Sequence, residues 1–502
     1  MKIRVKLLPG TPNDSNRDYL PESILGSDMV VNENGNNSQP LPERLMKFHE
    51  TLQDGFEGTW YEYVPSTYDP AKKTPIVFSM HGGLMTGWGQ CVYTSWSMIA
   101  EREGLIVVYP DGHSNRFWAM VKMTGRKAPA KCAGIAIPPD TDTAEENYDQ
   151  NFILRLIDHM KAKYNVDESR IFMQGMSNGS GVTQQFAQYY GDRITGACIS
   201  AGAHRMLAYT DGNGHLVNRA GALDIWLTCP ENNSVYPENL PQEARAAKEA
   251  RYYWMKVNQA APIPQIKIVG EDNFAFYHGK KANLTFMDVK NRDHGQTLDE
   301  ACLCWDYMFS GSSRKEHQMI HTDTREQRSG DGFAAAFTPG VAQVWWHNEV
   351  YALPAAPVKR QMLKYHGLNG GSIVRGEYLM VPLCFLAQMS GAQYYPSKDG
   401  RSATVELPNG SVLQFAQGVI GCMIDDSLRS MTCETILQEH ELLVSVEWYA
   451  QYILNKSITK CNDVVYVTDH FAQLSYFMAD LLKDLLNHRE MPENFIQEAL
   501  FL

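Results

Sequence analysis

The chain has 502 residues, 44% of them hydrophobic and 20% charged, which is the composition of a globular protein rather than a disordered one. This length exceeds what one hydrophobic core usually supports, so we expect more than one domain. The formal net charge is −12 without a dense run of lysine or arginine, which argues against nucleic acid and anionic membranes as partners.

Residues 1–55 are polar, with the run "NENGNNSQPLPE" at 32–43, and we expect an irregular N-terminal extension. The first residues lack the apolar core and small-residue cleavage site of a signal peptide, and no segment approaches the roughly 20 continuous apolar residues of a membrane span. Cys198 and Cys384 lie inside apolar runs, which favours buried thiols in a reducing compartment. We therefore expect a cytoplasmic protein; a chain already trimmed of an export signal would have the same pattern and would be secreted.

From Trp60 onward, apolar runs of strand length alternate with segments of helical periodicity. The strand-like runs are apolar on both faces. Strands are predicted at 74–83, 104–112, 169–175, 194–202 and 222–229, and helices at 96–104, 147–166, 180–193 and 243–258. Strands that alternate with helices in this way indicate an α/β fold, with a mainly parallel sheet covered by helices on both faces.

The stretch "IFMQGMSNGSG", residues 171–181, contains the pattern Gly-x-Ser-x-Gly at Gly175, Ser177 and Gly179. The pattern is short, but its serine follows a predicted strand and opens a predicted helix, which is the context of a nucleophile elbow. The two glycines leave room for the tight turn, and the helix directs backbone N–H groups at the serine. We therefore predict that Ser177 is a nucleophile with an exposed hydroxyl; a Gly/Ser-rich helix cap is the alternative interpretation.

A serine nucleophile requires N–H donors that stabilise the oxyanion formed during its attack. The N–H of Asn178, directly after the serine, is the first expected donor. The segment "SMHGGLMTG" (79–87) places His-Gly-Gly after a buried strand, as in the donor loops of lipases. We expect the second donor to be the N–H of Gly83 or of Leu84, and we expect His81 to hold the loop in place.

The general base should lie downstream, because the chain order in this fold is serine, acid, histidine. His294 lies in a loop after a predicted strand and is followed by the predicted helix "DEACLCWDYMFS". We predict that His294 is the base, with His278 in "FYHGKKAN" as the main rival. The neighbouring Asp288 and Asp293 are expected to be surface acids.

The acid of the triad should follow the strand at 222–229, where the chain reads "PENNSVYP". Glu231 is the first choice, because a glutamate can replace an aspartate in holding and stabilising the imidazolium. Asn232 or Asn233 could orient the ring without supplying charge. Asp272 is the reserve.

A polar segment around 311–340 predicts a linker, and a weak internal repeat follows it. The repeat compares "LMVPLCFLAQMSG", which begins at Leu379, with "LLVSVEWYAQYIL", which begins at Leu442. In each copy an extended run leads into a helix and then into a strand-like segment. We therefore predict a smaller α+β C-terminal domain made of two repeated units.

The elbow segment, together with "PIVFSMHGG", "GLIVVYPDG" and "NRDHGQ", resembles the feruloyl esterase and poly(3-hydroxybutyrate) depolymerase group of α/β-hydrolases, over roughly residues 58–312. The resemblance implies an α/β-hydrolase fold, with Ser177 as nucleophile and His294 as base. At the acid loop that family usually has Gly-x-x-Asp, whereas this chain has Cys-Pro-Glu-Asn-Asn, so the resemblance does not identify the acid.

The repeat resembles the copper amine oxidase N-terminal-like domain, a module attached to many bacterial extracellular enzymes, over about residues 345–470. The resemblance implies a structural or adhesive role without copper, since the segment has no His-x-His or Cys/His cluster. The predicted bounds are 1–55 for the extension, 56–312 for the α/β-hydrolase domain, 313–344 for the linker, 345–485 for the α+β domain and 486–502 for a C-terminal tail.

These residues and the resemblance imply a serine carboxylesterase that forms an acyl-enzyme and needs no metal or organic cofactor. Trp88, Trp118 and Tyr236 near the expected site could form a slot for a planar acyl group, although each alone is better explained as a core residue. The slot favours hydroxycinnamate (feruloyl-type) esters of plant cell-wall carbohydrate, so the expected partner is a small or polysaccharide-linked ester. The alternatives are an acetyl-xylan-type esterase, a polyhydroxyalkanoate or polyester depolymerase and, from another class, an inactive hydrolase-fold protein that binds carbohydrate.

Overall fold

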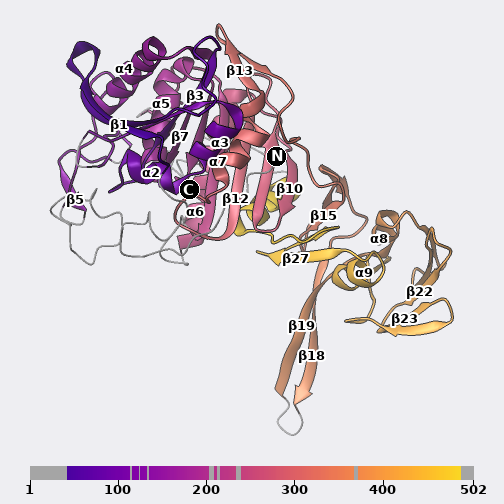
Figure 1. Ribbon diagram of the computed structural model, residues 1–502. Helices are drawn as coiled ribbons and strands as arrows, with labels where there is room; N and C mark the ends of the chain where they lie inside the picture. The colour runs from indigo at the N-terminus through magenta and orange to yellow at the C-terminus, as the bar shows by residue number, and fades with distance from the viewer. Residues whose placement is uncertain are drawn as a thin grey trace. The chain divides into compact units, whose positions relative to one another are not determined.

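The computed structural model describes residues 42–113, 116–123, 125–132, 135–202, 208–211, 215–232, 239–366 and 371–487 (Figure 1). The chain divides into two compact units. The first comprises Met1–Pro264, Ala275–Ser329 and Glu493–Leu502, and the second comprises Gln265–Phe274 and Gly330–Pro492. Within these described ranges, no helix is long and apolar enough to cross a membrane.

The first unit is built on a mainly parallel sheet. Its strands are β1 (Leu45–Thr51), β2 (Glu57–Tyr63), β3 (Thr74–Met80), β4 (Ile106–Pro110), β7 (Val166–Met176), β8 (Gly196–Ser200), β9 (Asp224–Asn232) and β12 (Leu284–Asp293). They are hydrogen-bonded in the order β1-β2-β4-β3-β7-β8-β9-β12. The pairs from β4 to β12 are parallel, whereas β1 and β2 run antiparallel to their neighbours. Because parallel strands end at the same edge of a sheet, the loops after β3, β7, β9 and β12 meet there.

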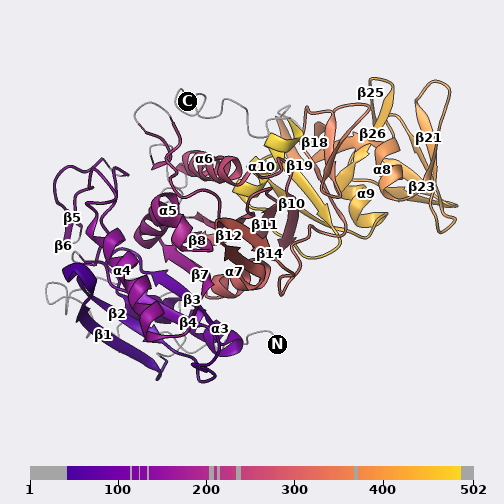
Figure 2. The same cartoon turned by 90° about the horizontal axis from the view of Figure 1, so that it is seen from above.

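Helices cover both faces of this sheet. Figure 2 shows α3 (Trp96–Glu103) and α7 (Glu300–Tyr307) on one face and α4 (Tyr148–Lys163), α5 (Asn178–Tyr190) and α6 (Leu240–Asn258) on the other. Local sequence fixes several of the ends. The Asn147 side chain caps α4 by accepting from the Gln150 N–H, and Gly104 ends α3 with a left-handed φ of 75°.

The strands and helices predicted between residues 74 and 258 are all present, as β3, β4, β7, β8 and β9 and as α3, α4, α5 and α6. The chain turns sharply at Ser177 between β7, in the middle of the sheet, and α5. A central parallel strand, a serine turn and a helix in this order define the α/β-hydrolase fold. The predicted fold of the first domain is therefore confirmed.

The prediction of an irregular extension over residues 1–55 is wrong for its described part, because β1 lies within it. β1 pairs antiparallel with β2, and the ring of Phe48 stacks on that of Trp60 with 5.8 Å between ring centroids. An edge strand is held mainly by backbone hydrogen bonds and a few such contacts. Its polar sequence "LMKFHET" therefore gives no clear alternation that a sequence reading could detect.

The predicted linker over 313–344 is also wrong. It holds most of a hairpin formed by β13 (Ser312–Lys315) and β14 (Gln318–His321), all of β15 (Ala334–Phe337), and the start of β16 (Gln343–Trp346). The hairpin turn uses Glu316 at a φ of 57°. These strands are short, and the hairpin carries charged side chains, so neither length nor apolar alternation distinguishes them from a loop.

The second unit contains three antiparallel sheets in its described part. Their orders are β17-β16-β15-β28-β27, β18-β19-β26-β25 and β20-β21-β22-β23-β24. The bounds not yet given are β10 (Gln265–Val269), β17 (Glu349–Ala352), β18 (Val358–His366), β19 (Gly371–Pro382), β20 (Gln393–Pro396), β21 (Ser402–Glu406), β22 (Val412–Ala416), β23 (Gly421–Ile424), β24 (Ser427–Ser430), β25 (Ile436–Gln438), β26 (Glu441–Ser445), β27 (Ser457–Cys461) and β28 (Val464–Thr468), with α8 (Leu383–Met389), α9 (Val446–Tyr452) and α10 (Tyr476–Leu486). One buried core joins side chains of all three sheets, among them Val344, Val381 and Leu413.

The two copies of the sequence repeat have the same order of elements. The first runs β19, α8, β20 and the second runs β26, α9, β27. The corresponding residues Val381 and Val444 stand directly opposite each other where β19 and β26 pair antiparallel. The resemblance of this unit to the copper amine oxidase N-terminal-like domain stays a prediction.

Candidate active site

Ser177 lies at the turn between the end of β7 at Met176 and the start of α5 at Asn178. Its backbone has φ 55° and ψ −115°, a combination that residues with a side chain rarely adopt. The turn lifts the serine to the carboxyl edge of the sheet, and the first N–H groups of a helix have no partner within that helix. The local geometry is that of a nucleophile elbow, as the sequence predicted.

The two glycines of the motif are required by close backbone contacts. A Cβ at Gly175 would lie 2.5 Å from the carbonyl carbon of Gly179, and a Cβ at Gly179 would lie 2.5 Å from the carbonyl oxygen of His81. Both neighbours are main chain, so they could move only with the strand or helix that carries them. The glycines therefore permit α5 to approach the ends of β3 and β7.

His294 is the histidine that the fold brings to this serine. Its Nε2 lies 2.9 Å from the Ser177 Oγ. It sits in the short loop that follows β12, next to Gly295, which has a φ of +133°. A Cβ at Gly295 would collide with the Tyr93 hydroxyl, so the loop packs closely against α2 (Gly87–Tyr93).

Burial lowers the pKa of His294; the Asp293 and Glu243 carboxylates oppose that shift, and the charge of Arg292 adds to it. The ring is therefore neutral at neutral pH. A neutral ring can present an unprotonated Nε2 to the serine hydroxyl, which is the state that a general base requires.

The rival histidine, His278, lies elsewhere. It follows β11 (Asp272–Tyr277), where Arg328 and His321 are its charged neighbours and burial lowers its pKa. Arg328 donates to the Leu284 carbonyl at the start of β12, whereas His294 follows the end of that strand. His278 is thus placed at the opposite end of β12 from His294.

The predicted donor loop after β3 is ordered by buried His81. Its Nε2 accepts the Gly112 N–H at 2.9 Å, and its Nδ1 lies 2.7 Å from the Gly82 carbonyl, so Nδ1 carries the proton. Burial lowers the pKa of His81 to about 3, which keeps the ring neutral. The expectation that His81 holds the loop agrees with this geometry.

The loop also decides between the two candidate oxyanion donors. The N–H of Leu84 donates to the Arg116 carbonyl at 3.0 Å, so the Leu84 alternative is wrong. Gly83 stays the predicted second donor beside the Asn178 N–H. The Asn178 side chain accepts the Trp118 N–H at 2.7 Å, which ties the first turn of α5 to the segment beneath the donor loop.

Glu231, the predicted acid, is 8% exposed near the end of β9. Its carboxylate accepts the Asn291 backbone N–H at 3.1 Å. Burial dominates the pKa of His294, and the carboxylates that oppose it are Asp293 and then Glu243. The role of Glu231 stays a prediction, with those two acids as competitors that the sequence reading did not favour.

The other acid candidates are placed differently. Asn232 is exposed and pairs with Asp293 where β9 meets β12, next to the histidine loop. Asn233 lies outside the described residues, and Asp272 belongs to the second unit. Asp288 is fully buried on β12, so the expectation of a surface acid is wrong there; the strand is buried on both faces from Leu284 to Val289.

Trp118 does not line the aromatic slot that the sequence predicted. This side chain is 1% exposed, its indole N–H donates to the His81 carbonyl at 2.8 Å, and its ring packs on the His81 ring. It supports the donor loop and cannot contact a substrate without unfolding it. Trp88 is half-buried on α2, and Tyr236 lies outside the described residues.

An apolar cluster includes Met176, the last residue before the elbow; the sequence indicated its member Leu84 only as a backbone donor. Met176 and Ala201 flank the ends of β7 and β8 and pack with Phe117, with Leu84 against the same cluster. A Cβ at Gly83 would lie 2.6 Å from the Phe117 ring, so this ring closes against the donor loop. The pattern gave no signal for these contacts, because they join loops far apart in the sequence.

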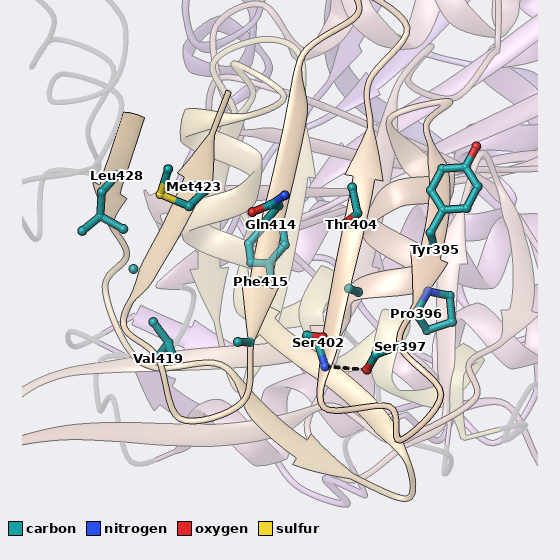
Figure 3. A pocket seen from close by; sticks show the side chains of 13 residues that line it. Tyr395, Pro396, Ser397, Ser402, Thr404, Gln414, Phe415, Val419, Met423 and Leu428 are labelled. Atoms are coloured by element: carbon teal, nitrogen blue, oxygen red, sulfur yellow. Dashed lines mark hydrogen bonds between the residues drawn. The ribbon is translucent and has the colours of Figure 1, made fainter. Parts of the chain in front are cut away.

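A hollow of about 520 Å³ lies in the second unit, on the outward face of β20 to β24 (Figure 3). Paired residues form a row across it: Tyr395, Thr404, Gln414, Met423 and Leu428. Its lining offers hydroxyl, amide and apolar groups but no carboxylate, imidazole or amine. This hollow therefore lacks groups for acid–base catalysis, whereas the serine and histidine of the first unit supply them. Over the described parts of the chain, no three histidine, cysteine or acidic side chains gather to hold a metal ion.

The curated proteins to which the chain is similar include several acetylxylan esterases. No family model matches the chain. It is similar to acetylxylan esterase A of Emericella nidulans, with 26% identity over 290 residues that cover 57% of this chain and 78% of the relative. It is also similar to a probable acetylxylan esterase A of Neosartorya fischeri, with 26% identity over 253 residues; that match covers 50% of this chain and spans only 55% of the relative's length. The solved acetyl xylan esterase from Aspergillus awamori matches 52% of this chain and 97% of its own, with 16% identity and a TM-score of 0.36.

We predict that Gly179→Ala removes the reaction of Ser177 with a fluorophosphonate and destabilises the fold by about 1–3 kcal/mol, because its Cβ meets main-chain carbonyls. Gly181→Ala on the same helix is the matched control. Its Cβ would meet only flexible side-chain ends, those of Met120 at 2.8 Å and Met123 at 3.4 Å, so we expect wild-type labelling and stability. Thermal unfolding and labelling measure both effects. Wild-type behaviour of Gly179→Ala would contradict the contact described.

We predict that the acid limb of the kcat/KM profile for a p-nitrophenyl ester has its midpoint below the ordinary histidine value of about 6.5. Burial lowers the pKa of His294, so the neutral base form persists to lower pH. Below the midpoint, protonation of Nε2 removes the acceptor for the serine proton. A midpoint above that value would show that burial does not control this ring.

Proposed function

We propose that the protein is a serine carboxylesterase that hydrolyses acetyl esters on a polysaccharide of the xylan type. One observation carries the proposal: the His294 Nε2 lies 2.9 Å from the Ser177 Oγ, at an elbow whose φ of 55° only close packing sustains. A strained serine beside a neutral, partly buried histidine is the arrangement that activates a hydroxyl nucleophile.

The reaction follows from these positions. The Ser177 Oγ attacks the ester carbonyl carbon while His294 Nε2 takes the hydroxyl proton, and the N–H groups of Asn178 and Gly83 stabilise the oxyanion. His294 then gives that proton to the leaving sugar oxygen, which leaves an acyl-serine. Water attacks the acyl-serine by the same path, with His294 as base, and releases the acid and the free serine.

The relatives support acetyl esters over feruloyl esters. Those named in the comparison are acetylxylan esterases, which corresponds to the alternative rather than the first expectation from the sequence. The sequence favoured a hydroxycinnamate because of an expected aromatic slot. Trp118 is not available for such a slot, because its ring is buried against the donor loop.

A carbohydrate-binding protein without activity is the competing proposal from another class. It accounts poorly for the elbow, since a left-handed serine costs about 1–3 kcal/mol that binding alone would not require. It accounts poorly for the neutral histidine beside that serine as well. Both features have an evident use only if the serine reacts.

We predict that wild-type protein hydrolyses p-nitrophenyl acetate and releases acetate from acetylated xylan, whereas Ser177→Ala loses both activities and keeps its fold. Methyl ferulate and a short hydroxybutyrate oligomer test the other ester classes in parallel. We expect kcat/KM for the acetyl ester to exceed that for ferulate, because the relatives named above are acetylxylan esterases. A ferulate preference would reverse the substrate proposal, and retained turnover in Ser177→Ala would overturn the nucleophile.

We propose Glu231 as the acid and predict that Glu231→Gln lowers kcat by about 10²-fold or more, with a smaller change in KM. The glutamine can still accept the Asn291 N–H, so the loop should keep its shape. Asp293→Asn and Glu243→Gln are the matched comparisons, for which we expect losses below about tenfold. If either of them loses more than Glu231→Gln, the role of acid passes to that residue.

A further inference from the structure

Two buried glutamines join the strand that bears the serine to the loop that bears the histidine. Gln174 lies on β7, three residues before Ser177, and Gln296 follows β12, two residues after His294. Their exposed fractions are 2% and 3%. The Gln174 Nε2 donates to the Gln296 Oε1 at 2.6 Å, so this bond runs beside the bond between the reacting side chains.

Gln174 is fully engaged on the side of the sheet. Its Oε1 accepts from the Ser79 Oγ at 2.6 Å and from the Gln90 Nε2 at 3.1 Å. Its Nε2 also donates to the Ser200 Oγ at 3.2 Å. The amide is thus held by β3, α2 and β8 at once, which leaves it one orientation.

Gln296 is fixed on the side of the loop. Its side-chain Nε2 donates to the Tyr93 backbone carbonyl at 3.4 Å, and its backbone carbonyl accepts from Arg292 Nη2 at 2.6 Å. The Tyr93 carbonyl can only accept, so the nitrogen of Gln296 faces it and the oxygen faces Gln174. The Arg292 bond closes the loop over the residues between, and His294 is at its centre.

We propose that Gln296 and Gln174 are positioning residues for His294: their buried bond sets the distance between the histidine ring and the serine. This inference rests on the proposed function, but it concerns a contact that neither the motif nor the mechanism uses. Close glycine backbones fix the elbow, and the bonds of Arg292 and Gln296 hold the histidine loop on either side of His294. A shift of about 1 Å at a reacting group can cost on the order of 10²-fold in rate. Loss of the Gln174–Gln296 bond, which we call the strut, should therefore have a measurable effect.

The test uses Gln296→Met in the full chain, because methionine keeps the length of the side chain and removes its hydrogen bonds. Gln174 then still has Ser79, Gln90 and Ser200 as partners. Gln188→Met is the matched control. Gln188 is equally buried, donates to the Ala208 carbonyl at 2.9 Å, and lies on α5 away from the histidine loop. The double variant Gln174→Met/Gln296→Met removes both ends of the strut.

We expect Gln296→Met to lower kcat and the rate of fluorophosphonate labelling of Ser177 by about 10- to 100-fold, with KM within about twofold. Gln188→Met should lower the melting temperature by a comparable amount and leave kcat within about twofold. The double variant also removes the Gln174 partner of Ser79, Gln90 and Ser200, so its melting temperature should fall below that of Gln296→Met, while kcat should fall little further because the strut is already broken. A purely structural role predicts instead that kcat falls further together with stability.

The inference is overturned if Gln296→Met keeps wild-type kcat, or if its loss does not exceed that of Gln188→Met. The NMR signals of the His294 ring nitrogens give a readout that needs no turnover. We expect the Nε2 signal to lose the shift caused by the Ser177 hydroxyl in Gln296→Met, and an unchanged signal overturns the strut. If the wild-type protein is neither labelled nor active, the proposed function fails, and the ring signals still decide whether the glutamines position the histidine.

Discussion

The close approach of the α5 backbone to the ends of β3 and β7 is the constraint on which the site depends. Gly179 lies against the carbonyls of Met80 and His81, and Gly175 lies against Gly179. No side chain fits between these backbones, so the strand and the helix lie close together and the chain passes from one to the other at a single residue. Ser177 takes that position, and its left-handed backbone is the result. The same contact brings the first turn of the helix beside the donor loop. The positions of the nucleophile and of the predicted oxyanion donors therefore depend on one backbone contact.

Two histidines near the elbow have different roles, and burial and hydrogen bonding together explain the difference. Burial lowers the pKa of both His81 and His294, so both rings are neutral. His81 has its two nitrogens occupied by the backbone of Gly112 and Gly82, which makes it a fixed part of the loop. His294 keeps Nε2 for the serine. The protonation state is common to the two residues, and the partners decide which one can move a proton.

The sequence was sufficient for the features that have local causes. Periodicity located the central strands and helices, and the glycines around Ser177 marked the elbow because their reason is steric and lies within five residues. It failed where the cause is distant. β1 has few apolar residues because its stability comes from pairing at an edge. Trp118 could not be recognised as a support for the donor loop, and Gln296 could not be paired with Gln174, because only the folded sheet brings such residues together.

The second unit is not a simple appendage to the hydrolase, because it takes Gln265–Phe274 from the middle of the hydrolase chain. Those residues bond to distant parts of their own unit: the Ile266 carbonyl accepts from Asp331, and Gly270 exchanges hydrogen bonds with Phe471 and Gln473. A stop codon placed after the hydrolase region would keep β10 and delete these partners. The result would be a strand with unsatisfied backbone groups, which invites aggregation. Recombination faces the same obstacle, since each unit is made of separate segments of the chain and no single crossover transfers either unit whole.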